Sequence, residues 1–248
     1  MAPEPAARSA VLQRFSRAER AVHWTIAVLM IVCILTAAIL YNGSLASQIG
    51  HRRVVELVHV YCGFALPAPM LLGVIFAAYR ADLKRLNRFT PSDWHWLRAR
   101  NRRDGSIRVG KFNAGQKLNG SLSAGAILVL LGTGIIMYFT GLTRLSWRTG
   151  ATFVHDWFAL AIGLLVVGHI MFAIRDPEAR RGMRHGQVSR RWARAEHPDW
   201  VAELEALENA VDRSGGPASR DGEDSGNDQQ SRGRNEDRAF DRLDEPEV

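Results

Sequence analysis

The sequence contains few cysteines, and this scarcity limits the chemistry of the chain. Two are present among 248 residues, Cys33 and Cys62, and both lie within apolar stretches. No C-x-x-C-H motif occurs, so covalent attachment of a c-type haem is not expected. Four clustered thiolates are also lacking, which argues against an iron–sulfur centre held by this chain alone. We interpret both cysteines as small buried hydrophobic residues.

The N-terminal twenty residues lack the features of a secretory signal. They contain no apolar core ahead of the first long apolar stretch and no clear cleavage site. We therefore expect the first apolar stretch to remain in the mature protein as a helix.

Four long stretches are nearly free of charge, although the mean hydropathy of the whole chain is slightly negative. They cover residues 22–41, 54–79, 119–139 and 153–174. A helix needs about 20 residues to cross a hydrocarbon core, and none of the stretches shows the sustained alternation of a strand. The sequence predicts an all-α protein, an integral membrane four-helix bundle. Pro67 and Pro69 predict a kink in the second span.

Basic residues gather in particular loops, which indicates membrane orientation rather than binding of nucleic acid. The formal net charge is +7. Eleven Lys or Arg lie in residues 80–117 and seven in 175–194, against two in each of the other two loops. By the positive-inside rule both termini and the long loop are expected to be cytoplasmic.

The domain organisation follows from these patterns. Residues 1–13 form an N-terminal extension, residues 14–200 form the membrane domain, and residues 201–212 form a short helical piece. Residues 213–248 hold ten acids and six bases with almost no apolar side chains. Such a composition predicts a disordered tail.

Four of the eight histidines fall inside or at the edge of the apolar stretches: His23, His59, His155 and His169. An ionisable group at membrane depth is costly, so each is a candidate functional residue. His155 and His169 are 14 residues apart, which turns the helix by about 40° net and raises it by about 21 Å. One helix therefore presents two imidazoles on one side at two depths.

Helix direction predicts which histidines share a depth. His23 begins the first span and His169 ends the fourth, so both are expected at the cytoplasmic side. His59 and His155 begin spans that start outside, so both are expected at the outer side. Two such pairs suit two six-coordinate haems, each with two axial imidazoles. Zinc is a weaker alternative, because two histidines form an incomplete zinc site. A haem-free anchor or small transporter would use the histidines for packing or proton relay.

The chain resembles the cytochrome b (gamma) subunit of membrane-bound respiratory formate dehydrogenase, within the prokaryotic di-haem cytochromes b. The resemblance covers about residues 14–200. It is carried by R-x-x-H-W-T at 20–25, His59, G-K-F-N-A-G-Q-K at 110–117, the spacing of His155 and His169, and S-R-R-W-A-x-x-x-H-P-x-W at 189–200.

The resemblance implies two haem b groups, an inner one held by His23 and His169 and an outer one held by His59 and His155. It also implies an iron–sulfur partner subunit and a separate catalytic subunit with a molybdenum or tungsten cofactor, in the bacterial cytoplasmic membrane. The chain itself would transfer electrons and reduce quinone. A cytochrome b subunit of a nickel–iron hydrogenase, or of another quinone-linked oxidoreductase, is the alternative within the same family.

The resemblance further implies a quinone site at Asn113 and Gly115, with Gln116 as a neighbour. A quinone carbonyl accepts hydrogen bonds from side-chain amides or backbone N–H groups. The alternative is purely structural, with Asn113 capping the helix that follows.

Overall fold

The structure is a computed structural model that describes residues 9–100, 102 and 107–214. The chain divides into two units, residues 1–205 and 206–248, and the membrane bundle lies in the first. The predicted disordered tail from residue 215 onward, and the predicted N-terminal extension up to residue 8, lie outside the described residues. In chain order the elements are β1 (Val11–Gln13), α1 (Arg17–Tyr41), α2 (Gly43–Ile49), α3 (Arg52–Ala65), α4 (Ala68–Gly73), α5 (Ala77–Leu86), α6 (Pro91–Arg98), α7 (Ala114–Tyr138), α8 (Leu145–Arg175), α9 (Pro177–His185), β2 (Gln187–Ser189), α10 (Arg190–Glu196) and α11 (Pro198–Ser214).

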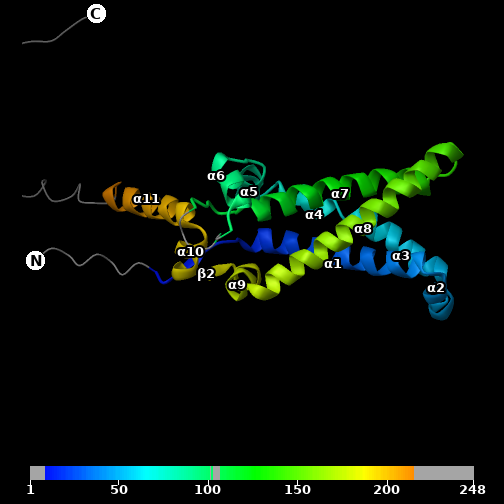
Figure 1. The fold of residues 1–248 in the computed structure, drawn as a ribbon, viewed down its shortest axis with the longest axis horizontal. Coiled ribbons are helices and arrows are strands. Elements are labelled where there is room, and N and C mark those ends of the chain that lie inside the picture. The colour runs from blue at the N-terminus through cyan, green and yellow to red at the C-terminus, as the bar shows by residue number, and fades with distance from the viewer. Residues whose placement is uncertain (1–8, 101, 103–106, 215–248) are drawn as a thin grey trace, which may run out of the picture. The chain divides into compact units, whose positions relative to one another are not determined.

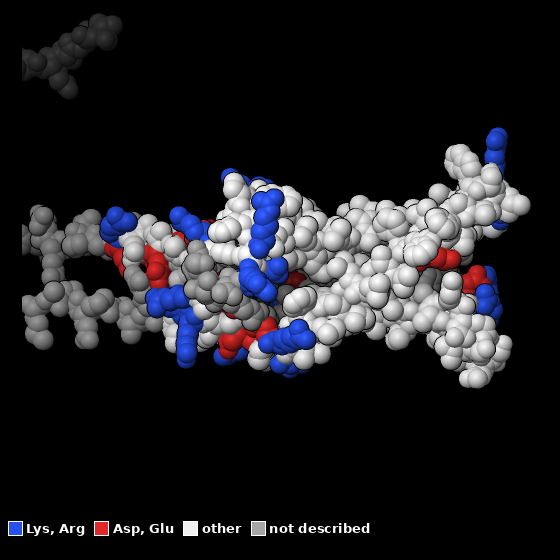
Figure 2. Space-filling view, viewed as in Figure 1, with Lys and Arg blue, Asp and Glu red and all other residues white. Residues whose placement is uncertain are grey.

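Four helical segments are long and apolar enough to cross a membrane: α1, α3 with α4, α7 and α8. They lie lengthwise beside one another, with α1 against α3 and α7 against α8 (Figure 1). Figure 2 shows a middle zone free of Lys, Arg, Asp and Glu, with these residues gathered at the two ends. The predicted four-span, mainly helical membrane protein is confirmed.

The second span is shorter than predicted and is interrupted. Helix α3 ends at Ala65 and α4 begins at Ala68. The break therefore includes Pro67, one of the two prolines that predicted a kink. The span ends at Gly73 rather than Tyr79, because the chain turns and Tyr79 belongs to the separate helix α5. The Tyr79 ring covers Gly73 so closely that a Cβ there would lie 2.8 Å from it.

Other boundaries differ because polar residues extend the helices. Helix α7 begins at Ala114, five residues before the predicted start at 119, and α8 begins at Leu145, eight residues before 153. Helix α1 starts with a capping box, in which Ser16 and Glu19 satisfy one another's backbone N–H groups. A helix also covers the predicted helical piece, as α11.

A small two-stranded sheet joins the start and the end of the bundle, and the sequence did not predict it. Strands β1 and β2 pair antiparallel, with Leu12 opposite Val188. Leu12 and Val188 pack with Ala193, Trp200 and Val201 in a buried cluster. The chain segments before α1 and after α8 therefore lie on the same side of the bundle.

Gly186 closes this sheet, and its conformation admits no larger residue without strain. Its φ of 85° is left-handed, and a Cβ would meet the Phe15 carbonyl oxygen at 2.5 Å. The Gly186 carbonyl accepts hydrogen bonds from the backbone N–H groups of Arg14 and Phe15. The tight turn thus holds the residues that lead into α1.

We expect Gly186→Ala to lower the thermal unfolding temperature of the purified chain in detergent. The left-handed conformation alone costs a residue with a Cβ about 1–2 kcal/mol, and the contact with Phe15 adds to it. Gly150→Ala in α8 is the control, since open space surrounds Gly150 and alanine favours a helix. Equal unfolding temperatures for the two variants would contradict the claim that position 186 requires glycine.

Candidate functional site

The four intramembrane histidines meet in two pairs. His23 of α1 faces His169 of α8, with ring centres 6.2 Å apart and ring planes crossed at 60°. His59 of α3 faces His155 of α8, with ring centres 6.3 Å apart and planes crossed at 67°. These are the pairs that helix direction predicts.

The spacing of each pair fits a metal held between two imidazoles. Bonds from a metal to imidazole nitrogen are about 2 Å long, so a metal between two facing rings sets their centres roughly 6 Å apart. Within the described residues, no three His, Cys, Asp or Glu side chains gather closely enough to hold a metal ion. A metal at either pair thus needs further ligands from outside the protein, which a haem macrocycle supplies.

An apolar layer separates the two pairs. Ile162 lies seven residues from His155 and seven from His169 on α8. It packs with Met30, Leu66, Ala126 and Ile127 in a buried cluster. The bundle therefore keeps the two pairs at distinct depths.

Both rings of the His59–His155 pair hydrogen-bond to threonine. The Nδ1 atom of His59 lies 2.9 Å from Thr36 Oγ1, and Nδ1 of His155 lies 2.8 Å from Thr133 Oγ1. Neither threonine carries a signal in the sequence that marks it as a site residue. The sequence shows that hydroxyl residues occur at the depth of the outer histidines, but it does not show which helix face, or which neighbour, their side chains meet.

Asn113 and Gln116 form a capping box at the start of α7. Asn113 Oδ1 accepts from the Gln116 backbone N–H at 2.9 Å, and Gln116 Oε1 accepts from the Asn113 backbone N–H at 3.1 Å. The structural role that the sequence suggested for Asn113 is thus present. The box uses only the two amide oxygens, and no described residue accepts from either side-chain NH₂ group. Gly115 lies between them beneath Trp96, whose ring a Cβ would meet at 3.2 Å.

Arg14 and His197 hold segment 110–117 in place, and neither was predicted to be a site residue. His197 is 1% exposed, and its Nδ1 lies 2.7 Å from the Gly110 carbonyl oxygen. Arg14 donates to the Lys111 carbonyl at 2.9 Å and contacts His197 Nε2 at 3.1 Å. Because Arg14 can only donate, His197 accepts at Nε2 and donates from Nδ1. The motif at 189–200 therefore anchors the segment.

The two lysines of the segment bind buried carboxylates. Lys117 Nζ lies 2.7 Å from Asp93, whose pKa is lowered; burial opposes this shift, but hydrogen bonds from Lys117 and Thr90 outweigh it. Lys111 Nζ lies 2.5 Å from Asp82 and 3.7 Å from Glu19. These ion pairs connect segment 110–117 to α6, α5 and α1.

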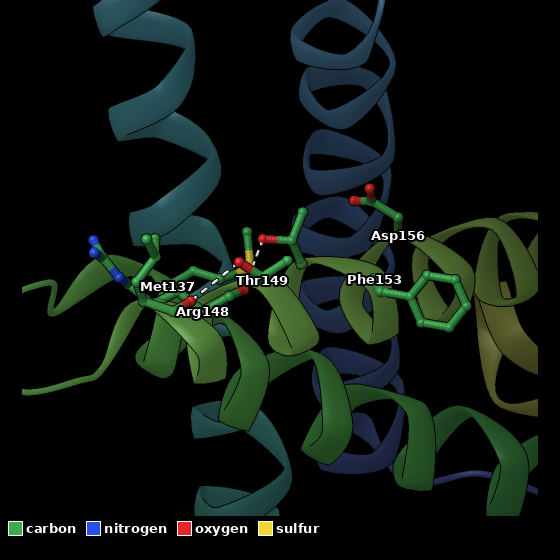
Figure 3. Close-up of a pocket in the computed structure, with 7 residues that line it drawn as sticks. Met137, Arg148, Thr149, Phe153 and Asp156 are labelled. Carbon is green, nitrogen blue, oxygen red and sulfur yellow. Dashed lines mark hydrogen bonds between the residues drawn. The ribbon is translucent and has the colours of Figure 1, made fainter.

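One open pocket lies near the beginning of α8, and its lining reaches Asp156, the chain neighbour of His155. Its lining residues are Met137, Leu145, Arg148, Thr149, Thr152, Phe153 and Asp156. Figure 3 shows Arg148, Thr149, Phe153 and Asp156 spread along α8, with Met137 contributed by α7. None of the candidate site residues lines this pocket.

The fold and the paired imidazoles together define a class, a helical membrane protein in which two histidine pairs lie between the spans at two depths. Residues 14–186 match the prokaryotic cytochrome b561 family, and the chain belongs to it. Membership implies haem b as the cofactor. All four paired histidines and segment 110–117 fall within the matched residues.

Three relatives show how the similarity is distributed. The chain is 26% identical over 213 residues to the cytochrome b556(Fdn) subunit of nitrate-inducible formate dehydrogenase from Escherichia coli K12, covering 81% of this chain and 95% of that one. It is 24% identical over 212 residues to the cytochrome b556(fdo) subunit of formate dehydrogenase from the same strain, covering 79% and 95%. A formate dehydrogenase cytochrome b556 subunit of Haemophilus influenzae is 37% identical over 99 residues, covering 38% and 41%.

The carboxyl groups beside Lys111 predict a dependence of stability on pH. Burial, with a hydrogen bond to Glu19, raises the pKa of Asp82 from 3.8 to about 7 against the opposing effect of Lys111. Glu19 Oε1 and Asp82 Oδ1 are buried and receive no hydrogen bond from the other described residues, so a proton on Asp82 would give the two carboxyl groups a partner in each other. A carboxyl with a raised folded-state pKa binds more protons when folded, so the contribution of Asp82 to stability falls as pH rises from 3.8 to about 7.

We therefore expect Asp82→Asn to flatten this decline, measured as the unfolding temperature in detergent at pH 5 and at pH 7.5. Asp199→Asn, which removes a carboxylate paired with Arg108 at the surface, controls for the loss of one charge. An Asp82→Asn protein as sensitive to pH as the wild type would show that Asp82 ionises normally.

Proposed function

We propose that the chain is the cytochrome b subunit of a formate dehydrogenase and carries electrons across the bacterial cytoplasmic membrane to quinone. The single observation that carries this proposal is the two facing histidine pairs, His23 with His169 and His59 with His155, at separate depths of a four-span bundle. The names of the similar proteins supply the choice of formate dehydrogenase. Formate oxidation then belongs to a molybdenum- or tungsten-containing partner, and an iron–sulfur subunit delivers the electrons.

The two pairs serve as axial ligands of an inner and an outer haem b. A bound haem b supplies a one-electron Fe(III)/Fe(II) couple, whose potential depends on its axial ligands, burial and nearby charge. Each pair joins two different spans, so ligation also holds the spans together. By the positive-inside rule, the basic loops favour a cytoplasmic side for both termini and segment 110–117, and His23 and His169 would lie on that side in this proposal.

Segment 110–117 is the quinone site in this proposal. The capping box leaves the NH₂ groups of Asn113 and Gln116 as donors for a quinone carbonyl. Helix α7 also leaves the Gly115 backbone N–H without an intrahelical acceptor, since it belongs to the first turn. The buried anchors Arg14, His197 and Lys111 fix the segment, which reduces the ordering that binding requires.

We expect His169→Ala to remove the inner haem and His59→Ala to remove the outer one. Each variant then holds one haem per chain instead of two, because an iron that loses one of its two axial imidazoles is held weakly. Haem content per chain, from the pyridine haemochrome spectrum of purified protein, measures this. His95→Ala, at an exposed histidine of α6, is the control and keeps both haems. Two full haems in His169→Ala would refute the ligand assignment.

The quinone site is tested by variants that keep the helix cap. Asn113→Asp and Gln116→Glu preserve the capping oxygens but replace each NH₂ donor with an acceptor. Losing one hydrogen bond of about 1 kcal/mol weakens quinone binding roughly fivefold, so we expect a higher KM in reoxidation of the dye-reduced protein by a soluble quinone. Haem content and unfolding temperature stay at wild-type values.

Asn113→Ser caps as well as asparagine and adds no charge, so it separates loss of the amide from addition of a negative charge. An unchanged KM in all three stable variants would leave Asn113 and Gln116 with a capping role alone. Co-purification of the full chain with its neighbours separates a formate dehydrogenase from a hydrogenase or another oxidoreductase.

A further inference from the structure

The two histidine pairs differ in what holds their rings. In the His59–His155 pair, Nδ1 of each ring contacts a threonine hydroxyl, at 2.9 Å from Thr36 and 2.8 Å from Thr133. Among the described residues, no side chain or backbone group hydrogen-bonds to the ring of His23 or of His169. The two pairs therefore offer metal ligands of different character.

The direction of these hydrogen bonds follows from the other contacts of the hydroxyls. Thr36 Oγ1 lies 2.7 Å from the Val32 carbonyl, and Thr133 Oγ1 lies 2.8 Å from the Val129 carbonyl, one helical turn earlier in each case. A hydroxyl has one proton, and a carbonyl can only accept. Each threonine therefore donates to its own helix and accepts the Nδ1–H of the histidine.

This direction selects the tautomer of both imidazoles. With the proton on Nδ1, the Nε2 atom of each ring carries a free lone pair and can bind a metal. The opposite tautomer would leave Nδ1 facing a hydroxyl oxygen whose proton is already engaged. The hydroxyl contacts thus prepare Nε2 of His59 and His155 for coordination.

The threonines lie on helices other than those of the histidines that they contact. Thr36 of α1 reaches across to α3, and Thr133 of α7 reaches across to α8. Thr36 is 8% exposed. Valine has nearly the same shape and would avoid burying a polar group, so packing alone does not account for a hydroxyl at this position.

Building on the proposed haem ligation, we propose that Thr36 and Thr133 are positioning residues that orient His59 and His155 and lower the reduction potential of the outer haem. Accepting the Nδ1 proton raises the basicity of the imidazole, and a more basic ligand stabilises ferric over ferrous iron. The inner pair receives no such contact from the part of the chain that the structure describes. Electron flow from the outer to the inner pair is thereby favoured.

Redox titration of the purified full chain, followed by its visible spectrum, tests this inference. We expect Thr36→Val and Thr133→Val each to raise the midpoint potential of one of two b-type couples and leave the other unmoved. If the ligands' preference for ferric over ferrous iron falls tenfold, the midpoint potential of a one-electron couple rises by about 59 mV. Thr36→Ser and Thr133→Ser retain the hydroxyl and are expected to keep the wild-type potential.

Thr149→Val is the matched control. Thr149 makes the same kind of bond to its own helix, 3.1 Å from the Leu145 carbonyl, and no histidine among the described residues hydrogen-bonds to it; Figure 3 shows it on α8. Should a valine variant lose the outer haem, retention of that haem by the serine variant still supports the inference. Valine variants with both potentials unmoved, or serine variants that shift as far as valine, overturn it.

The experiment separates this inference from the proposed function. A wild-type chain that binds no haem, or a His59→Ala variant that keeps both, refutes the ligation itself. A wild type with two couples that Thr36→Val and Thr133→Val do not move refutes only the role of the threonines.

Discussion

Lipid offers no hydrogen bonds, and this constraint organises the bundle around helix α8. Every polar side chain between the spans has to find its partner inside the protein or on a cofactor. Helix α8 carries two of the four imidazoles, at two depths, and so requires a partner at each. Helices α1 and α3 supply those partners as His23 and His59. Helix α8 thus packs along α7 and meets α1 and α3 at these imidazole contacts.

Features that depend only on the order of residues along the chain could be predicted from the sequence. Apolar stretches of sufficient length predict the spans, and helix direction with a 14-residue spacing predicts which histidines share a depth. The interruption near Pro67 was also predictable, since proline lacks an N–H. The end of the same span was not, because residues 74–79 are as apolar as a span. The turn at Gly73 depends on the contact with Tyr79.

Features that depend on the rotation of one helix against another could not be predicted. Thr36 and Thr133 are ordinary residues of apolar helices until packing turns them toward His59 and His155. His197 is similar, because it meets Gly110 from 87 residues away in sequence. The motif at 189–200 was visible in the sequence, but its role in holding segment 110–117 appears only with the contacts. Asn113 caps α7 through its amide oxygen, which leaves its NH₂ group for the ligand role proposed above.

The two ends of the bundle differ in charge, and the difference acts in the same direction as the threonine contacts. The loops expected at the end that carries His23 and His169 hold an excess of basic residues, with eleven Lys or Arg against three acids in residues 80–117 and seven against two in 175–194, whereas each of the other two loops holds two. The rings at the other end contact neutral hydroxyls. Positive charge favours the reduced form of a nearby redox centre, whereas a more basic ligand favours the oxidised form. Under the proposed function, electrons would move from the hydroxyl-supported pair toward the cationic end, where segment 110–117 lies.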